Sequence, residues 1–160
     1  MLVKEKEITV EEFEQFLRLP EYQGRLFELI NGEIVEKMPT EEHGMIVMNI
    51  GIAIGNFIKK HGSAIKYYIR QQGRGRVGAE IRYRLLSDRH NSRQPDLSYS
   101  HGTLPAVISG AVPHMPELVV EVQSPDDSVK SMRERAEYFI ANDVQLVWLV
   151  FPRKRYVEVY

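Results

Sequence analysis

Two apolar stretches near the C-terminus, with an amphipathic segment between them, constrain the fold more than any other feature of this sequence. Residues 117–123 read Glu-Leu-Val-Val-Glu-Val-Gln, and residues 144–151 are apolar except for Gln145. The segment between them begins with the helix-start sequence Ser-Pro-Asp-Asp-Ser and has apolar residues at helical spacing: Val129, Met132, Ala136 and Phe139. A strand, a helix and a strand in this order predict a right-handed crossover between two parallel neighbours in one sheet.

The N-terminal part of the chain predicts a short helix and a β-hairpin. Thr9 and Glu12 have the spacing of a capping box, in which each side chain satisfies a free backbone amide at a helix start, and the helix should end near Leu19. Asn31-Gly32 lies between two half-apolar segments within residues 25–37 and favours the positive φ angles of a two-residue hairpin turn.

The central part predicts one long helix and several strands. The helix, over residues 41–61, is indicated by apolar residues that should share one face: Met45, Ile46, Ile50, Ala53, Ile54, Phe57 and Ile58. Residues 76–85 alternate between apolar and mostly basic residues, which predicts a strand with one buried and one basic face. Shorter strands are expected at 96–100 and 156–160, with a loop over 101–115. The sequence therefore predicts a mixed α/β sheet flanked by helices, with an N-terminal β-hairpin.

Length and composition narrow the class of protein. With 160 residues, the chain is expected to form a single domain over residues 1–160. It contains no cysteine, which excludes thiolate zinc sites, disulfide scaffolds and cysteine nucleophiles, and favours a cytoplasmic location. No signal peptide or membrane span is indicated, so we expect no association with a membrane.

The charge is distributed unevenly along the chain. The net charge is −1, but residues 59–93 hold ten basic residues and only two acidic ones, a net of +8. A polyanion such as nucleic acid could be attracted to this segment, although solvated strand faces are the commoner reason for such a run. The Gly-x-Gly-x-x-Gly pattern over residues 73–78 is not a dinucleotide motif, because a strand and not a helix follows it.

Two carboxylates occur where the strand pattern expects apolar residues or a turn. Glu121 lies in the middle of the apolar strand 117–123, and an unpaired buried carboxylate costs several kcal/mol. Asp96 follows Pro95 at the start of another short strand. If the two strands are neighbours, Asp96 and Glu121 can converge on a hard cation such as Mg²⁺, with a backbone carbonyl as a third ligand.

The arrangement Pro-Asp, then a Glu two residues before a polar residue, resembles the PD-(D/E)XK nucleases. The whole chain more closely resembles the Uma2 family, a bacterial group described as putative restriction endonucleases. The resemblance is carried by segments in the family's order: Phe27–Val35, His43, Gln94–Leu97, Glu117–Ser128 and Val147–Pro152. Relatives commonly continue beyond the strand that ends here at Tyr160, so a C-terminal family extension is expected to be absent.

The resemblance implies a restriction-endonuclease-like core and cleavage of DNA phosphodiesters by metal-activated water. Mg²⁺ or Mn²⁺ would be held by Asp96 and Glu121, with the carbonyl of Val122 as a further ligand. Glu33 and His43 match family positions that support the site. DNA is the expected partner, and a homodimer is compatible with duplex cleavage, which needs two cuts.

The sequence departs from the nuclease pattern at the position of the motif lysine. Gln123 stands there and offers no positive charge, whereas the position that matches the alternative lysine of some relatives is Arg135. Gln123 and Arg135 are expected to contact phosphate. A guanidinium stays protonated, so Arg135 can stabilise charge but cannot act as the base that activates water.

Other interpretations of the same residues remain open. Glu121 alone could be a buried glutamate paired with Arg135 for structural reasons. The departures at Gln123 and Arg135 are also compatible with a catalytically impaired nuclease fold that binds nucleic acid or a protein partner. A third interpretation is a hydrolase that acts on a smaller phosphate ester with the same ion.

Overall fold

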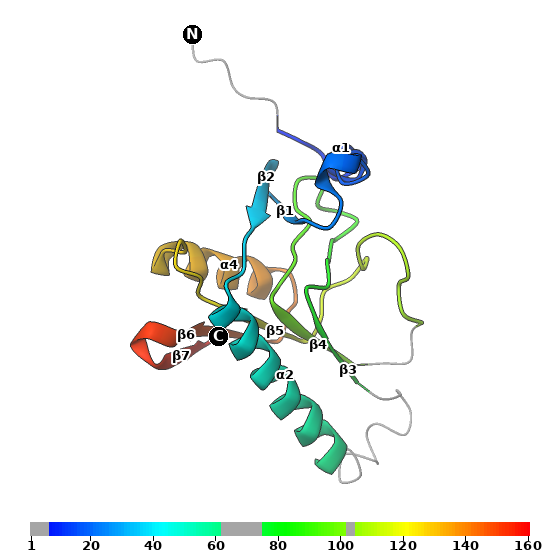
Figure 1. Ribbon diagram of the computed structural model, residues 1–160. Coiled ribbons are helices and arrows are strands. Elements are labelled where there is room, and N and C mark those ends of the chain that lie inside the picture. The colour runs from blue at the N-terminus through cyan, green and yellow to red at the C-terminus, as the bar shows by residue number, and fades with distance from the viewer. Residues whose placement is uncertain (1–6, 62–74, 102–104) are drawn as a thin grey trace. The chain divides into compact units, whose positions relative to one another are not determined.

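The computed structural model describes residues 7–61, 75–101 and 105–160 (Figure 1). The chain divides into two compact units. The first contains Met1–Met38, Arg82–Gln94 and Val107–His114, and the second contains Pro39–Ile81, Pro95–Ala106 and Met115–Tyr160. This division does not test the prediction of a single domain over residues 1–160, which stays a prediction.

The first unit is built around the expected N-terminal helix and hairpin. Helix α1 (Val10–Phe16) begins with the predicted capping box of Thr9 and Glu12, and a 3₁₀ turn, η1 (Pro20–Tyr22), follows it. Strands β1 (Leu26–Ile30) and β2 (Glu33–Lys37) pair in antiparallel fashion. Their turn has φ of 51° at Asn31 and 82° at Gly32, as the Asn-Gly pair predicts. The core of this unit consists of Val10, Phe13, Phe27 and Leu29.

The second unit contains a five-stranded mixed sheet. Its strands lie in the order β3 (Arg76–Ala79), β4 (Leu97–Ser100), β5 (Leu118–Val122), β6 (Leu146–Phe151) and β7 (Tyr156–Val159). Strands β5 and β6 are parallel, and the other neighbouring pairs are antiparallel. The crossover predicted between the two apolar strands is therefore present, and β6 is an inner strand, as its apolar sequence indicates.

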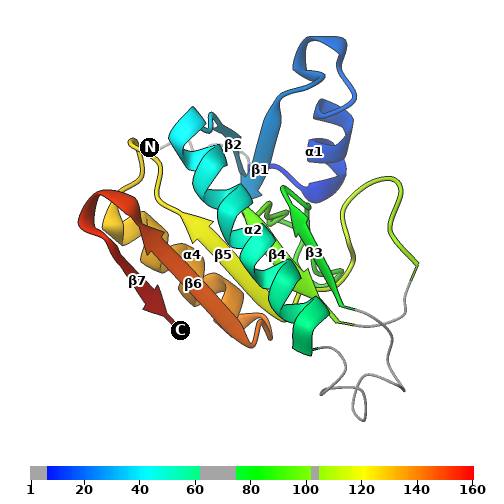
Figure 2. The same cartoon turned by 60° about the horizontal axis from the view of Figure 1, so that its bottom comes forward.

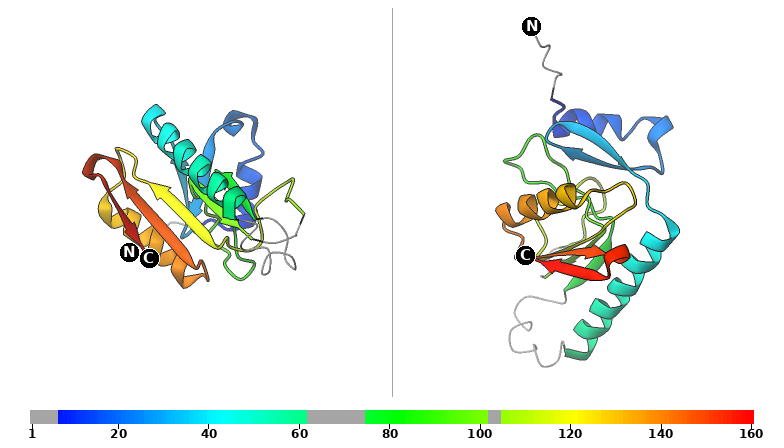
Figure 3. Two further views of the ribbon diagram at one scale, coloured as in Figure 1. Left: turned by 90° about the horizontal axis from the view of Figure 1, so that it is seen from below. Right: turned by 90° about the vertical axis from the view of Figure 1, so that its left-hand side faces the viewer.

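Two helices cover the two faces of this sheet, as Figures 2 and 3 show. Helix α2 (Glu41–His61) packs on a core formed by Leu97, Val120 and their neighbours, and α4 (Val129–Ala141) packs on the opposite face through Met132, Ala136 and Phe139. Ile46, Ile50 and Ile54 of α2 face the sheet, but Met45 and Phe57 are exposed. The apolar face of α2 is thus narrower than the spacing predicts.

The strand predicted over residues 76–85 is shorter in the structure. It ends at Ala79, because Glu80 adopts a left-handed backbone conformation with φ of 52° and breaks the extended alternation. Arg82 and Arg84 consequently do not form a basic face with Arg76. They belong to the first unit and form ion pairs with Glu14 and Glu11. The pattern over residues 73–78 and the cations Lys66, Arg70 and Arg74 fall wholly or partly outside the described residues.

Candidate active site

Asp96 is held by two hydrogen bonds at the start of β4. Its carboxylate is 2% exposed, and Oδ2 accepts a hydrogen bond from the backbone N–H of Val122 at 2.7 Å. The same oxygen lies 2.9 Å from Nε2 of His43, which is buried in the first turns of α2. The carboxylate is therefore fixed by the backbone of β5 and by a side chain of α2, and His43 contacts a predicted ligand directly.

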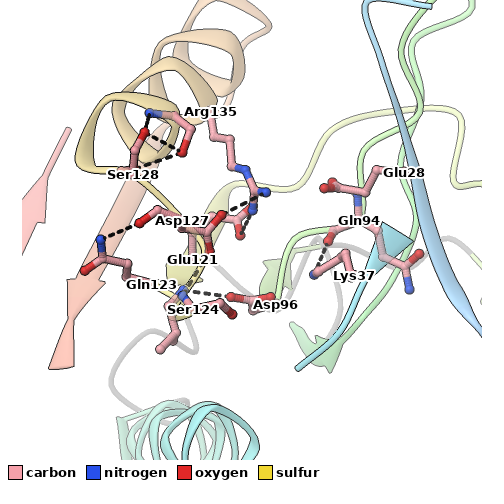
Figure 4. A network of polar contacts seen from close by, with 12 residues as sticks. Glu28, Lys37, Gln94, Asp96, Glu121, Gln123, Ser124, Asp127, Ser128 and Arg135 are labelled. Atoms are coloured by element: carbon pink, nitrogen blue, oxygen red, sulfur yellow. Dashed lines mark hydrogen bonds and ion pairs between the residues drawn. The ribbon is translucent and has the colours of Figure 1, made fainter. Parts of the chain in front are cut away.

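Glu121 lies in β5 and is 1% exposed. Its Oε2 forms an ion pair with Arg135 of α4 at 3.4 Å, and the guanidinium of Arg135 also lies 3.4 Å from Oδ1 of Asp127. Figure 4 shows Arg135 extending from α4 toward both carboxylates. Arg135 therefore reaches the sheet, as predicted. It also forms the ion pair that is expected if Glu121 has a structural role.

The strands that carry Asp96 and Glu121 are neighbours, as the metal hypothesis requires. In the antiparallel register of β4 and β5, Leu97 lies opposite Val120 and Ser98 lies opposite Val119. Asp96 directly precedes Leu97 and Glu121 directly follows Val120, so the two carboxylates flank the last pair of this register. The contacts of the two carboxylates nevertheless lead to different helices, because Asp96 bonds His43 of α2 and Glu121 bonds Arg135 of α4.

The chemistry of this donor set fits a hard divalent cation. Two buried carboxylates on adjacent strands offer the oxygen ligands that Mg²⁺ and Mn²⁺ prefer. Within residues 7–61, 75–101 and 105–160, no group of three or more histidine, aspartate or glutamate side chains is assembled for metal binding. A metal at this place would thus be held by Asp96 and Glu121, with main-chain oxygen such as the Val122 carbonyl completing the protein ligands.

Gln123, at the position of the motif lysine, makes local contacts. Its Nε2 donates to the backbone carbonyl of Asp127 at 2.9 Å, and its backbone N–H donates to the carbonyl of Val150 at 2.9 Å. Asp127 Oδ2 in turn accepts the N–H of Ser124. Gln123 therefore braces the loop between β5 and α4, and its contact with phosphate remains a prediction.

The hairpin of the first unit carries two acidic residues that bear on the prediction, Glu33 and Glu28. Glu33 is exposed at the turn end of β2 and pairs with Ile30, so its supporting role is untested. Glu28, which the sequence reasoning missed, is 1% exposed in β1. Its Oε1 accepts the N–H of Gln94 at 2.7 Å, and its buried Oε2 has no hydrogen-bond partner in the described part of the chain.

The sequence carried a signal for Glu28. It is a single charge within the apolar run Leu-Phe-Glu-Leu-Ile, the same anomaly that singles out Glu121 in its strand. The hydrogen bond from the backbone N–H of Gln94 to Glu28 lies within the first unit. Lys37 donates to the Gln94 carbonyl at 2.8 Å (Figure 4). Both the N–H and the C=O of Gln94 are therefore bonded to side chains of the β1–β2 hairpin.

A pocket of about 220 Å³ opens in the second unit beside His43. Three segments form it: the first turns of α2, the loop after β5 and the turn after β6. Its lining residues are Thr40, Glu42, His43, Ile46, Gln123, Ser124, Pro125, Pro152, Arg153 and Lys154. The pocket therefore adjoins the hydrogen-bonded pair of His43 and Asp96 and contains Gln123 in its wall.

A five-stranded mixed sheet with a helix on each face is the architecture of a restriction-endonuclease-like α/β protein. The chain belongs to the Uma2 family, described as "putative restriction endonuclease", because the family's sequence model matches residues 13–160. The expected family and fold class are both confirmed.

A solved structure supports the fold. A crystal structure described as a putative nuclease of DUF820 from Anabaena variabilis superposes with a TM-score of 0.65 at 24% sequence identity. The likeness covers 96% of this chain and 84% of that one. No functionally curated protein matches the sequence. In the described ranges, the structure has no helix with the length and apolar character needed to cross a membrane.

Proposed function

We propose that this protein is a divalent-metal-dependent DNA endonuclease that hydrolyses phosphodiester bonds. The observation that carries the proposal is that two buried carboxylates, Asp96 and Glu121, adjoin the last paired residues of β4 and β5, with Asp96 bonded to the N–H of Val122. Membership of a family described as restriction endonucleases supports nucleic acid as the substrate. The hydrolysis adds water across a P–O bond, and one product carries the phosphate while the other carries a hydroxyl.

Asp96, Glu121 and the carbonyl of Val122 would hold the ion, Mg²⁺ or Mn²⁺. When bound, the ion supplies a water of lowered pKa and stabilises negative charge on the phosphoryl oxygens. The hydrogen bond from Val122 N–H fixes the orientation of the Asp96 carboxylate and so prepares it as a ligand.

His43 and Arg135 would act around these ligands. His43 orients Asp96 through the 2.9 Å contact and lies in the pocket wall, where its imidazole can also exchange a proton with solvent or substrate. Arg135 keeps a permanent positive charge next to Glu121 and can stabilise the transition-state phosphate, together with Gln123. A supporting role for Glu33 stays a prediction from the family resemblance.

A second candidate function is nucleic-acid or protein binding on a nuclease fold that has lost turnover. Two observations favour it: Gln123 replaces the motif lysine, and both carboxylates already have protein partners, His43 for Asp96 and Arg135 for Glu121. These contacts place a protein group beside each carboxylate in the absence of an ion.

Nicking of supercoiled plasmid separates the two candidates. The full chain should convert supercoiled DNA to open circles with Mg²⁺ or Mn²⁺, and EDTA should stop the reaction. Asp96→Asn and Glu121→Gln should each lose at least about 100-fold in rate, since each removes a charged ligand while keeping the side-chain shape. Thermal melting and circular dichroism confirm that the variants fold.

Glu134→Gln is a matched control variant, because it removes one negative charge, as the two ligand variants do, from an exposed position of α4 that is not a proposed ligand. DNA binding without nicking under any divalent cation would favour the second candidate. Equal nicking by wild type and by both ligand variants would refute the endonuclease proposal.

A further inference from the structure

A compact turn after β6 carries three consecutive basic residues. The turn η2 (Pro152–Lys154) follows Phe151 directly, and Arg155 closes it with φ of 53° and a backbone hydrogen bond to the Pro152 carbonyl. Arg153, Lys154 and Arg155 are exposed, and none forms an ion pair with another described residue. The positive charge of this turn is therefore not neutralised by an ion pair within the described residues.

Many of the chain's other cations are committed to contacts. In the segment that is basic in sequence, Arg82, Arg84 and Arg89 form ion pairs with glutamates of α1, and Arg93 is buried. In the second unit, the cations of α4 are also paired: Lys130 with Glu134, Arg133 with Glu158, and Arg135 with Glu121. The turn is therefore a place outside residues 59–93 where unpaired positive charge is available to a polyanion.

The turn forms one wall of the pocket beside His43. Arg153 and Lys154 lie across from the first turn of α2, and the side chains of Thr40, Gln123 and Ser124 add hydrogen-bonding groups to the lining. Glu42 is the single carboxylate in the lining and opposes an anion. At about 220 Å³, the pocket is smaller than the usual range for small organic ligands, so it suits one charged group of a larger molecule.

We propose that this pocket binds a backbone phosphate of nucleic acid, with Arg153 and Lys154 as positioning residues. The inference rests on the proposed function and deepens it, because it names the surface that orients the DNA. His43 belongs both to the pocket lining and to the contact with Asp96, so a phosphate held there lies next to the candidate ligands. The turn would act on binding and orientation, and not on the chemical step.

The test compares two double charge reversals in the same unit. Arg153→Glu with Lys154→Glu alters the turn, and Lys59→Glu with Lys60→Glu alters two exposed lysines at the far end of α2. The two sites lie roughly 25 Å apart along that helix, at 1.5 Å per residue. Each double variant changes the net charge by the same amount, and all four side chains are exposed, so both should fold.

Binding is measured by fluorescence anisotropy of a labelled DNA duplex in EDTA, where metal-dependent cleavage cannot occur. The turn variant should raise Kd by about tenfold or more and reduce the slope of log Kd against log salt by about one, since the pocket holds one phosphate and each phosphate contact contributes about 0.9. The α2 variant should change Kd by less than about threefold. Equal losses for the two variants would overturn the proposal, because they would indicate unspecific charge attraction.

Two further experiments ask whether the phosphate belongs to a polymer or to a small molecule, and whether the turn acts on binding or on the chemical step. Inorganic phosphate and a mononucleotide should compete with the duplex only weakly, and competition at the affinity of the duplex would overturn assignment to a polymer backbone. Arg153→Ala with Lys154→Ala should raise KM for plasmid nicking with a much smaller change in kcat. If wild type binds DNA through the turn but does not nick it, the endonuclease proposal fails while this inference stands.

Discussion

Asp96 and His43 form the contact on which the candidate site most depends at the scale of single residues. One carboxylate oxygen, buried with the rest of the side chain, receives a backbone N–H from β5 and lies within hydrogen-bond distance of an imidazole nitrogen from α2. Hydrogen bonds to a charged group are stronger than neutral ones, and removal of one partner leaves the charge poorly solvated. This pair should therefore affect both stability and activity.

His43→Ala should destabilise the protein by about 1–3 kcal/mol, because it removes the donor to a buried carboxylate. His43→Gln retains an N–H near the position of Nε2 and should recover part of that loss. Urea denaturation of wild type and both variants measures the difference. If the glutamine and alanine variants were equally destabilised, the loss would come from packing and not from the hydrogen bond.

The sequence predicted which residues belong to this site, but it did not predict which of them contact one another. Glu121 is indicated by the charge it places in an apolar strand, Asp96 by its position after Pro95 at a strand start, and Arg135 by the family resemblance. The ion pair of Arg135 with Glu121 is one of the interpretations that the sequence leaves open. The bond between His43 and Asp96 joins residues 53 positions apart, and periodicity carries no information on such a pair. Glu28 was missed although it breaks its strand pattern as Glu121 does.

At the scale of elements, the strongest patterns predicted the structure best. The long helix begins where expected, at Glu41, and is described as far as His61, and the Asn-Gly pair predicts the hairpin turn. The prediction of a strand over residues 76–85 was wrong beyond Ala79, because Glu80 has a left-handed backbone conformation. The apolar and polar residues continue to alternate in the sequence after that position. Backbone reversals at residues other than glycine leave little trace in sequence, which explains this error.

Gly32→Ala should destabilise the hairpin by more than the matched variant Gly24→Ala. Both glycines have left-handed φ angles, of 82° and 78°, so each variant pays roughly 1 kcal/mol of backbone strain. An added Cβ at Gly32 would also meet Cβ of Glu7 at 2.8 Å, whereas at Gly24 it would meet nothing within 4 Å. The free energies of unfolding in urea compare them, and an equal loss would argue against the close contact with Glu7.

The pair of Arg133 and Glu158 joins α4 to β7 and should make stability depend on acid pH. The side-chain hydrogen bond from Arg133 lowers the pKa of Glu158 below its ordinary value of 4.5. A lowered folded-state pKa means that the contribution is present above pH of about 4.5 and is lost as the pH falls through the lower pKa. Glu158→Gln should flatten this part of the Tm profile between pH 7 and 3, and an unchanged acid dependence would contradict the assignment.

At the scale of the whole molecule, the chain passes repeatedly between its two compact units. The boundaries at residues 38, 81, 94, 106 and 114 each carry the chain from one unit to the other. Such interleaving favours a single cooperative unfolding transition, because neither unit is a continuous segment that can fold separately. The family match over residues 13–160 also spans both units.

Phe13→Ala and Phe139→Ala truncate the cores of the first and second unit, and each should cost about 3–5 kcal/mol. Trp148 is the only tryptophan and lies in the second unit, so its fluorescence reports on that unit alone. With cooperative unfolding, Phe13→Ala should lower the urea midpoint of Trp148 fluorescence as much as that of circular dichroism. Separate transitions would refute the single-domain prediction.

The most direct test of the central claim is an anomalous diffraction map from a crystal soaked in Mn²⁺. The account predicts a peak about 2.1–2.3 Å from carboxylate oxygens of both Asp96 and Glu121, at ordinary metal–oxygen distances. The Arg135 ion pair with Glu121 should lengthen as the ion takes its place. At saturating Mn²⁺, a map with no peak there and with both carboxylates still on His43 and Arg135 would contradict the account.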